Sequence, residues 1–346
     1  MAVAAQTYEQ VMMQLRQGQY KPVYLLYGDE PYYIDRVTEY VEDHILDEAA
    51  KAFDQVTLYG KDLPDGSIAE AVMQARGFAM FGGMKVVIVR EAQTLTKWDA
   101  LGAYLAAPQP QSILLIAYKK TSAPALKDSP NMVQMQSVPL RDYQVAGWIT
   151  RYIEEWNREQ KKQPGEDVKI DPKVAQILAD HLGTNLSQIV LSLQKLVDGR
   201  PAGKNIIDAE LVERNVGISK DFNNFALQEA LRDGDVVKAN RIVRYFASSK
   251  DHPIQKELPV LFSFFANLML YHYLPDKTNE RAVAAALKIN PFTVKNYAMA
   301  ARRFSAGKTF RIISYFRDTD ARSKGIGTGS ATDEDLWKEL IYKILH

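Results

Sequence analysis

The sequence predicts an α/β domain with a parallel sheet in its first 140 residues and an all-α remainder. Two observations predict this. From Pro22 to about Leu140, short runs rich in β-branched and aromatic residues alternate with helical patterns. After Pro139 only helical patterns remain. Strands that alternate with helices are typical of a parallel sheet covered on both faces.

Five runs are expected to be strands, and each is almost continuously apolar, which indicates burial on both faces. They are PVYLLYG (22–28), FDQVTLYG (53–60), KVVIVRE (85–91), SILLIAYKK (112–120) and MVQMQSV (132–138). A helix is expected to begin near Ser67, which forms a capping box with Glu70, and to end against Gly82 and Gly83.

The remainder of the chain is predicted to form helices in two groups. The segment 172–199 predicts two helices hinged at Gly183, the second capped by Asn185. From Phe222 onward every segment is amphipathic, except that VLFSFFANLML (260–270) is apolar on nearly every side and is therefore expected to be central in its bundle. These patterns predict three domains: 1–140, 141–215 and 216–346.

Composition excludes several classes of protein. Cysteine is absent, which excludes disulfides and thiolate chemistry and fits a reducing cytosol. No apolar run approaches the ~18 residues of a membrane span, so we expect a cytoplasmic protein without membrane contact. No two of the five histidines have a ligand spacing, so no metal is expected. They are His44, His181, His252, His272 and His346.

The charge of the chain is uneven along its length. The segment 216–346 carries 20 Lys and Arg against 14 Asp and Glu, whereas the first 215 residues carry 23 against 28. A basic excess of this size suits a polyanionic partner, but it also suits ordinary solvated helix faces, and without a cluster the second interpretation is favoured.

The first expected strand runs through a glycine into a helix, which is the layout of a phosphate-binding loop. A working loop reads G-x-x-x-x-G-K-[ST], in which backbone N–H groups and the lysine hold the phosphates and the hydroxyl holds Mg²⁺. Counted from Gly28, this chain has Tyr33 for the second glycine, Ile34 for the lysine and Asp35 for the hydroxyl. Pro31 also removes a backbone donor. We therefore expect no bound nucleotide and no cofactor.

A second departure from a nucleotide site, at the end of another expected strand, supports this expectation. The strand 85–91 ends in Arg90 and Glu91, where a nucleotide-hydrolysing protein of this layout would carry an Asp-Glu pair that helps to hold the metal. A simpler interpretation stays open, in which the chain never had such a site and Gly28 only turns a strand into a helix.

Three segments together resemble the delta subunit of bacterial DNA polymerase III, a clamp-loader component. They are the loop LLYGDEPYYID, the helix pair GTNLSQIVLSLQKL, and INPFTVKNYAMAARRFS followed by DTDARSKG. The resemblance extends from about Tyr8 to Leu345, and it depends on the order and spacing of the segments, since no single one is specific.

The resemblance implies an AAA+-like architecture: a RecA-like parallel-sheet domain, a small helical lid and a helical collar. It also implies a role. Such a subunit binds and opens the sliding clamp (the beta subunit), so that the clamp can be loaded on primed DNA, without hydrolysing ATP or having any other enzymatic activity of its own. Its collar would pack with the gamma/tau and delta prime subunits in a ring of five, as part of the DNA polymerase III holoenzyme, and the ring would hold primer–template DNA.

The resemblance also points to the residues that contact the clamp. In that family, apolar residues at a helix tip before the third strand hold the clamp, and here the matching residues are Phe78, Met80 and Phe81. Taken without the family, an apolar cluster at the end of a helix is usually part of a core. With it, large apolar side chains on a rigid support suit insertion into a pocket of a partner.

Several basic residues of the collar are candidates for contact with DNA phosphates. Lys295 and Arg302 lie seven apart on one expected helix face, and Arg303, Arg322 and Lys324 follow. The alternative for each of them is a solvated helix face or collar packing.

Two other functions compete with a clamp-loader subunit. One is an active P-loop ATPase or kinase, which Ile34, Asp35 and Arg90 disfavour. The other is a helical scaffold or interaction protein without a role in replication, which leaves the preceding α/β domain unexplained.

Overall fold

The structure, a computed structural model, divides into two compact units, Met1–Pro139 and Leu140–His346. It describes residues 5–80, 83–160, 166–201, 203–219, 222–249, 252–327 and 330–346. The predicted boundary near residue 215 falls inside the second unit and stays a prediction.

The first unit is a five-stranded parallel sheet between helices, as the sequence predicts. The strand order is β2-β3-β4-β1-β5. The strands are β1 Val23–Gly28, β2 Gln55–Tyr59, β3 Lys85–Arg90, β4 Ser112–Tyr118 and β5 Met132–Ser137. The helices are α1 Tyr8–Arg16, α2 Pro31–His44, α3 Glu48–Asp54, α4 Ala69–Arg76 and α5 Asp99–Tyr104, with 3₁₀ turns η1 Gly60–Asp62, η2 Pro64–Gly66 and η3 Ala92–Thr94.

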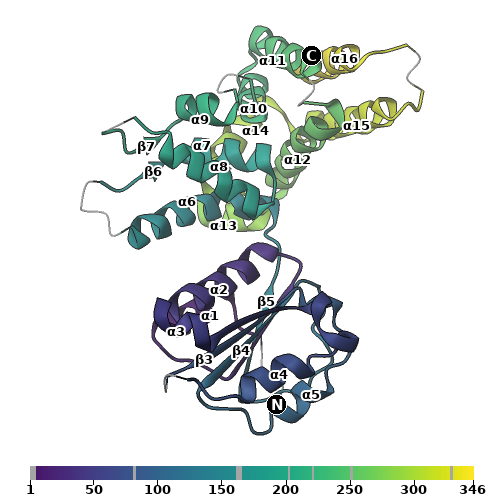
Figure 1. Cartoon of the computed structure of the whole chain (residues 1–346). Coiled ribbons are helices and arrows are strands. Elements are labelled where there is room, and N and C mark those ends of the chain that lie inside the picture. The colour runs from purple at the N-terminus through teal and green to yellow at the C-terminus, as the bar shows by residue number, and fades with distance from the viewer. Residues whose placement is uncertain are drawn as a thin grey trace. The chain divides into compact units, whose positions relative to one another are not determined.

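Helices cover both faces of this sheet, with α1 and α2 on one face and α4 and α5 on the other (Figure 1). Successive residues of a strand point to opposite faces, so both sets must be apolar. In β1, for example, Val23 and Leu25 belong to the core under α4 and α5, and Tyr24 and Leu26 are equally buried. Each such side chain contributes about 1.5–3 kcal/mol by leaving water.

Helix α4 is shorter than predicted. It begins at Ala69 and ends at Arg76, with Gly77 as C-cap, rather than at Gly82 and Gly83. Residues 81 and 82 lie outside the described residues. The predicted capping box is wrong as well, because Ile68 is the N-cap and has no side-chain hydrogen bond. Ser67 is extended, and its backbone forms an isolated β-bridge with Lys97.

Among its described residues, the second unit has helices and one small pair of strands. The prediction of no further strands is wrong, because β6 Lys169–Ile170 pairs with β7 Ile206–Ile207 in parallel. The predicted pair α7 and α8 is present on either side of Gly183, and Asn185 caps α8 through a hydrogen bond from Gln188 N. The helices of this part are α6 Asp142–Glu159, α7 Pro172–Leu182, α8 Leu186–Asp198 and α9 Ala209–Val216.

In the part of the chain that the structure describes, the seven helices after α9 share one core that is rich in aromatic residues. They are α10 Asn224–Asp233, α11 Val236–Ser248, α12 Ile254–Tyr273, α13 Glu280–Leu287, α14 Val294–Arg303, α15 Ala306–Ser323 and α16 Asp333–Leu345, with the 3₁₀ turn η4 Pro291–Thr293. Helix α12 packs against α10, α13, α14 and α15, which confirms its predicted central position. Its Phe265 contacts Phe304 and Phe316 at ring-centroid distances of 5.3 and 5.6 Å.

Candidate functional site

The loop after β1 is closed by its own side chains. Glu30 is the N-cap of α2, and its buried carboxylate accepts a hydrogen bond from Tyr32 N at 3.0 Å. A phosphate at this helix end would need the same backbone donors and the same positive end of the helix dipole. Because the position already holds a carboxylate, a triphosphate would meet repulsion there. Burial raises the pKa of Glu30, and the neighbouring Asp35 raises it further.

The glycine that begins this loop serves the backbone of the sheet. Gly28 has φ +141°, and a Cβ built on it would lie 1.8 Å from the carbonyl oxygen of Ser137 on the adjacent β5. Ser137 in turn donates from its hydroxyl to the carbonyl oxygen of Glu30 at 2.5 Å. This close approach of β1 and β5 explains the glycine without a ligand.

The three positions that correspond to the chemical groups of a phosphate loop have other contacts. Tyr33 packs against Tyr8 at a ring-centroid distance of 4.8 Å, and Ile34 is fully buried. Asp35 forms an ion pair with Lys119 at 2.7 Å. At the end of β3, Arg90 forms an ion pair with Glu42 on α2. The lysine position of the loop is therefore occupied by a buried apolar side chain, and the end of β3 carries a paired cation where a metal-binding acid would be expected.

Two of the predicted clamp-contact residues, Phe78 and Met80, lie in the loop between α4 and β3, rather than on the last turn of a helix. Phe78 is 77% exposed and Met80 is 73% exposed, so neither belongs to the core. Phe81 lies outside the described residues. This loop precedes β3, whereas Gly28 is the last residue of β1, so the two loops lie at opposite edges of the parallel sheet.

The predicted DNA-contact residues fall into three groups. Lys295 and Arg302 are exposed on α14, and within the described part of the chain neither has a hydrogen bond or an ion pair. Arg303 lies over the ring of Phe304, at 5.9 Å from Cζ to the centroid. Arg322 and Lys324 are paired with acids: Arg322 with Glu339 and Lys324 with Asp320, each at 2.7 Å.

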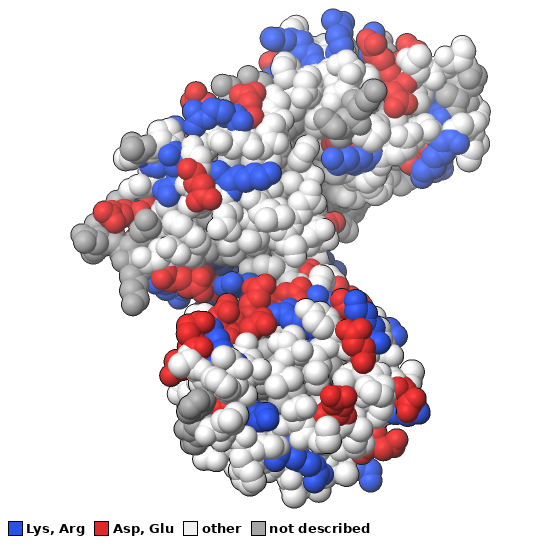
Figure 2. Space-filling model, in the orientation of Figure 1, with Lys and Arg blue, Asp and Glu red and all other residues white. Residues whose placement is uncertain are grey.

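The distribution of charge on the second unit does not single out one group of cations. On the face that Figure 2 shows, Lys and Arg are interspersed with Asp and Glu over this unit. The contact of the five basic residues with DNA stays a prediction, and Lys295 and Arg302 are its best candidates because no acid neutralises them within the described residues.

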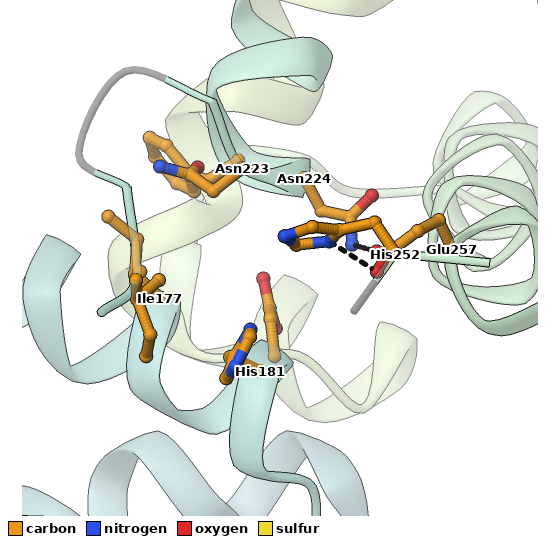
Figure 3. Close-up of a pocket in the computed structure, with 9 residues that line it drawn as sticks. Ile177, His181, Asn223, Asn224, His252 and Glu257 are labelled. Carbon is orange, nitrogen blue, oxygen red and sulfur yellow. Dashed lines mark hydrogen bonds and ion pairs between the residues drawn. The ribbon is translucent and has the colours of Figure 1, made fainter. Parts of the chain in front are cut away.

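A buried polar cluster in the second unit was missed by the sequence analysis (Figure 3). The Glu257 side chain on α12 accepts a hydrogen bond from Asn224 Nδ2 and lies 2.8 Å from His252 Nδ1. The His252 ring contacts that of His181 at a centroid distance of 5.9 Å. These groups line a small pocket together with Asp180 at the end of α7. No set of three or more potential metal ligands occurs among the residues that the structure describes.

The environment of Asp180 makes the stability of this unit depend on pH. Burial raises the pKa of Asp180 from 3.8 to about 7, and the nearby carboxylates of Glu257 and Asp142 add to the rise, while a hydrogen bond from Gln176 opposes it. The folded chain therefore binds more protons than the unfolded chain between these two pKa values. It follows that this group makes the chain less stable as pH rises from about 4 to about 7.

We expect Asp180→Asn to stabilise the chain, because it removes a charge that is unfavourable when buried and keeps the oxygen that accepts from Gln176. The gain in the free energy of unfolding should be at least about 1 kcal/mol at pH 8 and smaller at pH 5. Urea unfolding of both proteins between pH 5 and pH 8 measures this difference. A gain independent of pH would contradict the proposed titration.

Comparisons with known proteins agree with the resemblance seen in the motifs. Residues 221–344 match the family described as DNA polymerase III delta subunit, C-terminal domain. The chain is 24% identical to the DNA polymerase III subunit delta of Bacillus subtilis (strain 168) over 347 aligned positions, which cover 95% of this chain and 94% of that protein. These matches confirm the resemblance to DNA polymerase III delta subunits.

The fold is also that of a solved structure. The structure of the Bacillus subtilis DNA clamp loader delta protein is similar, with a TM-score of 0.50 and 20% sequence identity over 98% of this chain and 99% of that one. This likeness, together with the parallel sheet and the helices that follow it, confirms the predicted fold class. None of the helices among the described residues is both long enough and apolar enough to cross a membrane.

Proposed function

We propose that this chain, which resembles DNA polymerase III delta subunits over nearly its whole length, is the delta subunit of a bacterial replicative clamp loader. It binds and opens the sliding clamp so that the clamp can be loaded on primed DNA, and it does not hydrolyse ATP. The observation that carries the proposal is the exposure of Phe78 and Met80 on a loop of a packed domain.

The exposed loop supports binding to a protein partner. An aromatic and a thioether side chain that stand in solvent cost free energy in the isolated chain, and inserting them into an apolar pocket recovers it. Binding alone does not open a ring. The loop must make better contacts with the open or strained clamp than with the closed one, because a ligand shifts an equilibrium only through its difference in affinity for the two states.

The loop after β1 supports the absence of ATP hydrolysis. Glu30 occupies the end of α2 where a phosphate would bind, and Ile34 and Arg90 replace the groups that hold phosphate and metal. An active P-loop ATPase would need different side chains at these three positions.

The helical part supports the assembly role, since its helices bear exposed apolar side chains that suit packing with the other loader subunits. They include Leu270, Tyr273, Phe310 and Tyr342.

The test of this function uses the isolated full chain and the purified sliding clamp of the same organism. We expect binding without nucleotide, measured by calorimetry or size-exclusion chromatography, and no binding of Mg·ATP in a parallel titration. An absence of clamp binding would contradict the clamp-loader role. Saturable ATP binding that is lost on changing Asp35 would instead favour an active nucleotide site.

We expect the variant Lys295→Glu, Arg302→Glu to weaken binding of primer–template DNA by the assembled complex. Removing two phosphate contacts should also reduce the slope of log affinity against log salt by about two. Fluorescence anisotropy between about 50 and 200 mM salt measures both effects. Arg317→Glu is the control, because Arg317 is already paired with Asp318. An unchanged slope would exclude both residues.

A further inference from the structure

The loop that carries Phe78 and Met80 has an anchor elsewhere in the first unit. The backbone N–H of Met80 donates a hydrogen bond to Oδ1 of Asp54 at 2.7 Å, across 26 positions of sequence. Asp54 is the last residue of α3 and is only 1% exposed. A buried carboxylate that accepts a backbone hydrogen bond fixes the position of the donor, since either group alone would be costly to bury.

The topology of the sheet explains why these two residues meet. Asp54 immediately precedes β2, and the Phe78–Met80 loop precedes β3. β2 and β3 are parallel neighbours, with Gln55 opposite Val86. The segments that lead into them therefore lie at the same edge of the sheet, and an acceptor at the end of α3 can reach the loop.

The placement of Asp54 is unfavourable for α3 itself. A carboxylate at the C-terminus of a helix lies at the negative end of the helix dipole, where a basic residue would be preferred. The other end of α3 follows the usual rule, because Asp47 caps it through a hydrogen bond from Ala50 N at 2.8 Å. Asp54 is therefore explained by its contact with the distant loop, which compensates for its unfavourable place at the end of α3.

We infer that Asp54 is a positioning residue for clamp binding: its buried carboxylate holds the backbone of Met80 and thereby presents the side chains of Phe78 and Met80 to the clamp. The identity of the partner rests on the proposed function. The contact between Asp54 and the loop rests on the hydrogen bond alone. Preorganisation of this kind strengthens binding because the loop then loses less conformational entropy in the complex.

The experiment compares three single variants of the full chain. Asp54→Ser keeps a polar group but is too short to reach Met80 N, and it should weaken clamp affinity by about tenfold. Asp54→Asn keeps an acceptor oxygen, so its affinity should stay within about threefold of the original. Asp47→Ala weakens the other end of α3 without touching the loop, and it should leave affinity unchanged.

Two further readouts separate positioning from simple destabilisation. In the isolated chain, Asp54→Ser should speed amide hydrogen exchange in a peptide spanning 77–80, while Asp47→Ala should not. In a Met80→Ala background, Asp54→Ser should lower clamp affinity less than it does in the original chain, because one of the side chains it positions is already gone.

Each outcome has one meaning. If the original chain fails to bind the clamp, the proposed function is wrong, and the exchange measurement still decides whether Asp54 holds the loop. If the chain binds but Asp54→Ser changes neither affinity nor exchange, the positioning role is wrong. It is also wrong if Asp54→Ser does not fold, or if Asp47→Ala has the same effects, since Asp54 would then serve only the stability of the unit.

Discussion

Replacing Phe78 and Met80 together with alanine is expected to weaken binding of the sliding clamp by about a thousandfold or more. Apolar anchors that fill a pocket on a partner are each typically worth about 2 kcal/mol or more, and two of them give this factor. The stability of the chain itself should change little, because both side chains are mostly exposed in the isolated protein. Calorimetry with the purified clamp measures the affinity, and thermal unfolding measures the stability.

A matched control distinguishes this loop from any other exposed apolar residue. Met13 lies on α1 in the same unit and is also exposed, but α1 packs against α2 and β5, away from the loop. Met13→Ala should leave clamp affinity unchanged. If the double variant binds as tightly as the original chain, Phe78 and Met80 are not the anchors, and the contact must lie elsewhere on the chain.

The position of the anchors relative to the degenerate nucleotide loop has a mechanistic consequence. The anchors precede β3 at one edge of the sheet, and Gly28 ends β1 at the other. A related subunit with a working nucleotide site would bind ATP at the edge that holds Gly28. Under the proposed function the two edges have separate uses, so the absence of nucleotide chemistry at one would leave the apolar loop at the other intact.

The sheet was predictable because its signal is local. All five predicted runs are strands in the structure, and β1, β3 and β4 are almost continuously apolar, as burial on both faces requires. The edge strands β2 (QVTLY) and β5 (MVQMQS) contain polar residues, and β2 is only partly buried, so the predicted burial on both faces is wrong for β2. The small strands β6 and β7 were missed because two residues each are too few to show a pattern. The capping box at Ser67 failed because the Ser67 hydroxyl accepts a hydrogen bond from Ala69 N at 3.3 Å rather than from Glu70 N, while the Ser67 backbone forms a β-bridge with Lys97.

The polar cluster in the second unit was not predictable as a cluster, because Asp180, Asn224 and Glu257 are far apart in the sequence. One signal was available. Glu257 shares a helix face with Ile254, Leu258 and Leu261, all of them buried, so an acid on that stripe indicates a buried partner. Asp54 gave no such signal, because the sequence analysis placed it in the expected strand 53–60, whereas in the structure it is the last residue of α3.

The second large effect is expected at Gly28. Gly28→Ala should lower the free energy of unfolding by at least about 3 kcal/mol, because the new Cβ would meet the Ser137 carbonyl and the backbone would also be strained at positive φ. β1 and β5 would have to separate where they pair. Urea unfolding, with and without Mg·ATP, measures the loss, which we expect to be the same in both conditions.

Gly102→Ala is the control for this change. Gly102 lies in α5, and a Cβ there would have no neighbour within 4 Å, so alanine should leave stability unchanged or raise it by about 1 kcal/mol. A Gly28→Ala protein as stable as the original would mean that the contact between β1 and β5 does not require glycine. The expected loss, unaffected by nucleotide, would instead show that the packing of the sheet requires the glycine, and that no bound triphosphate is needed to explain it.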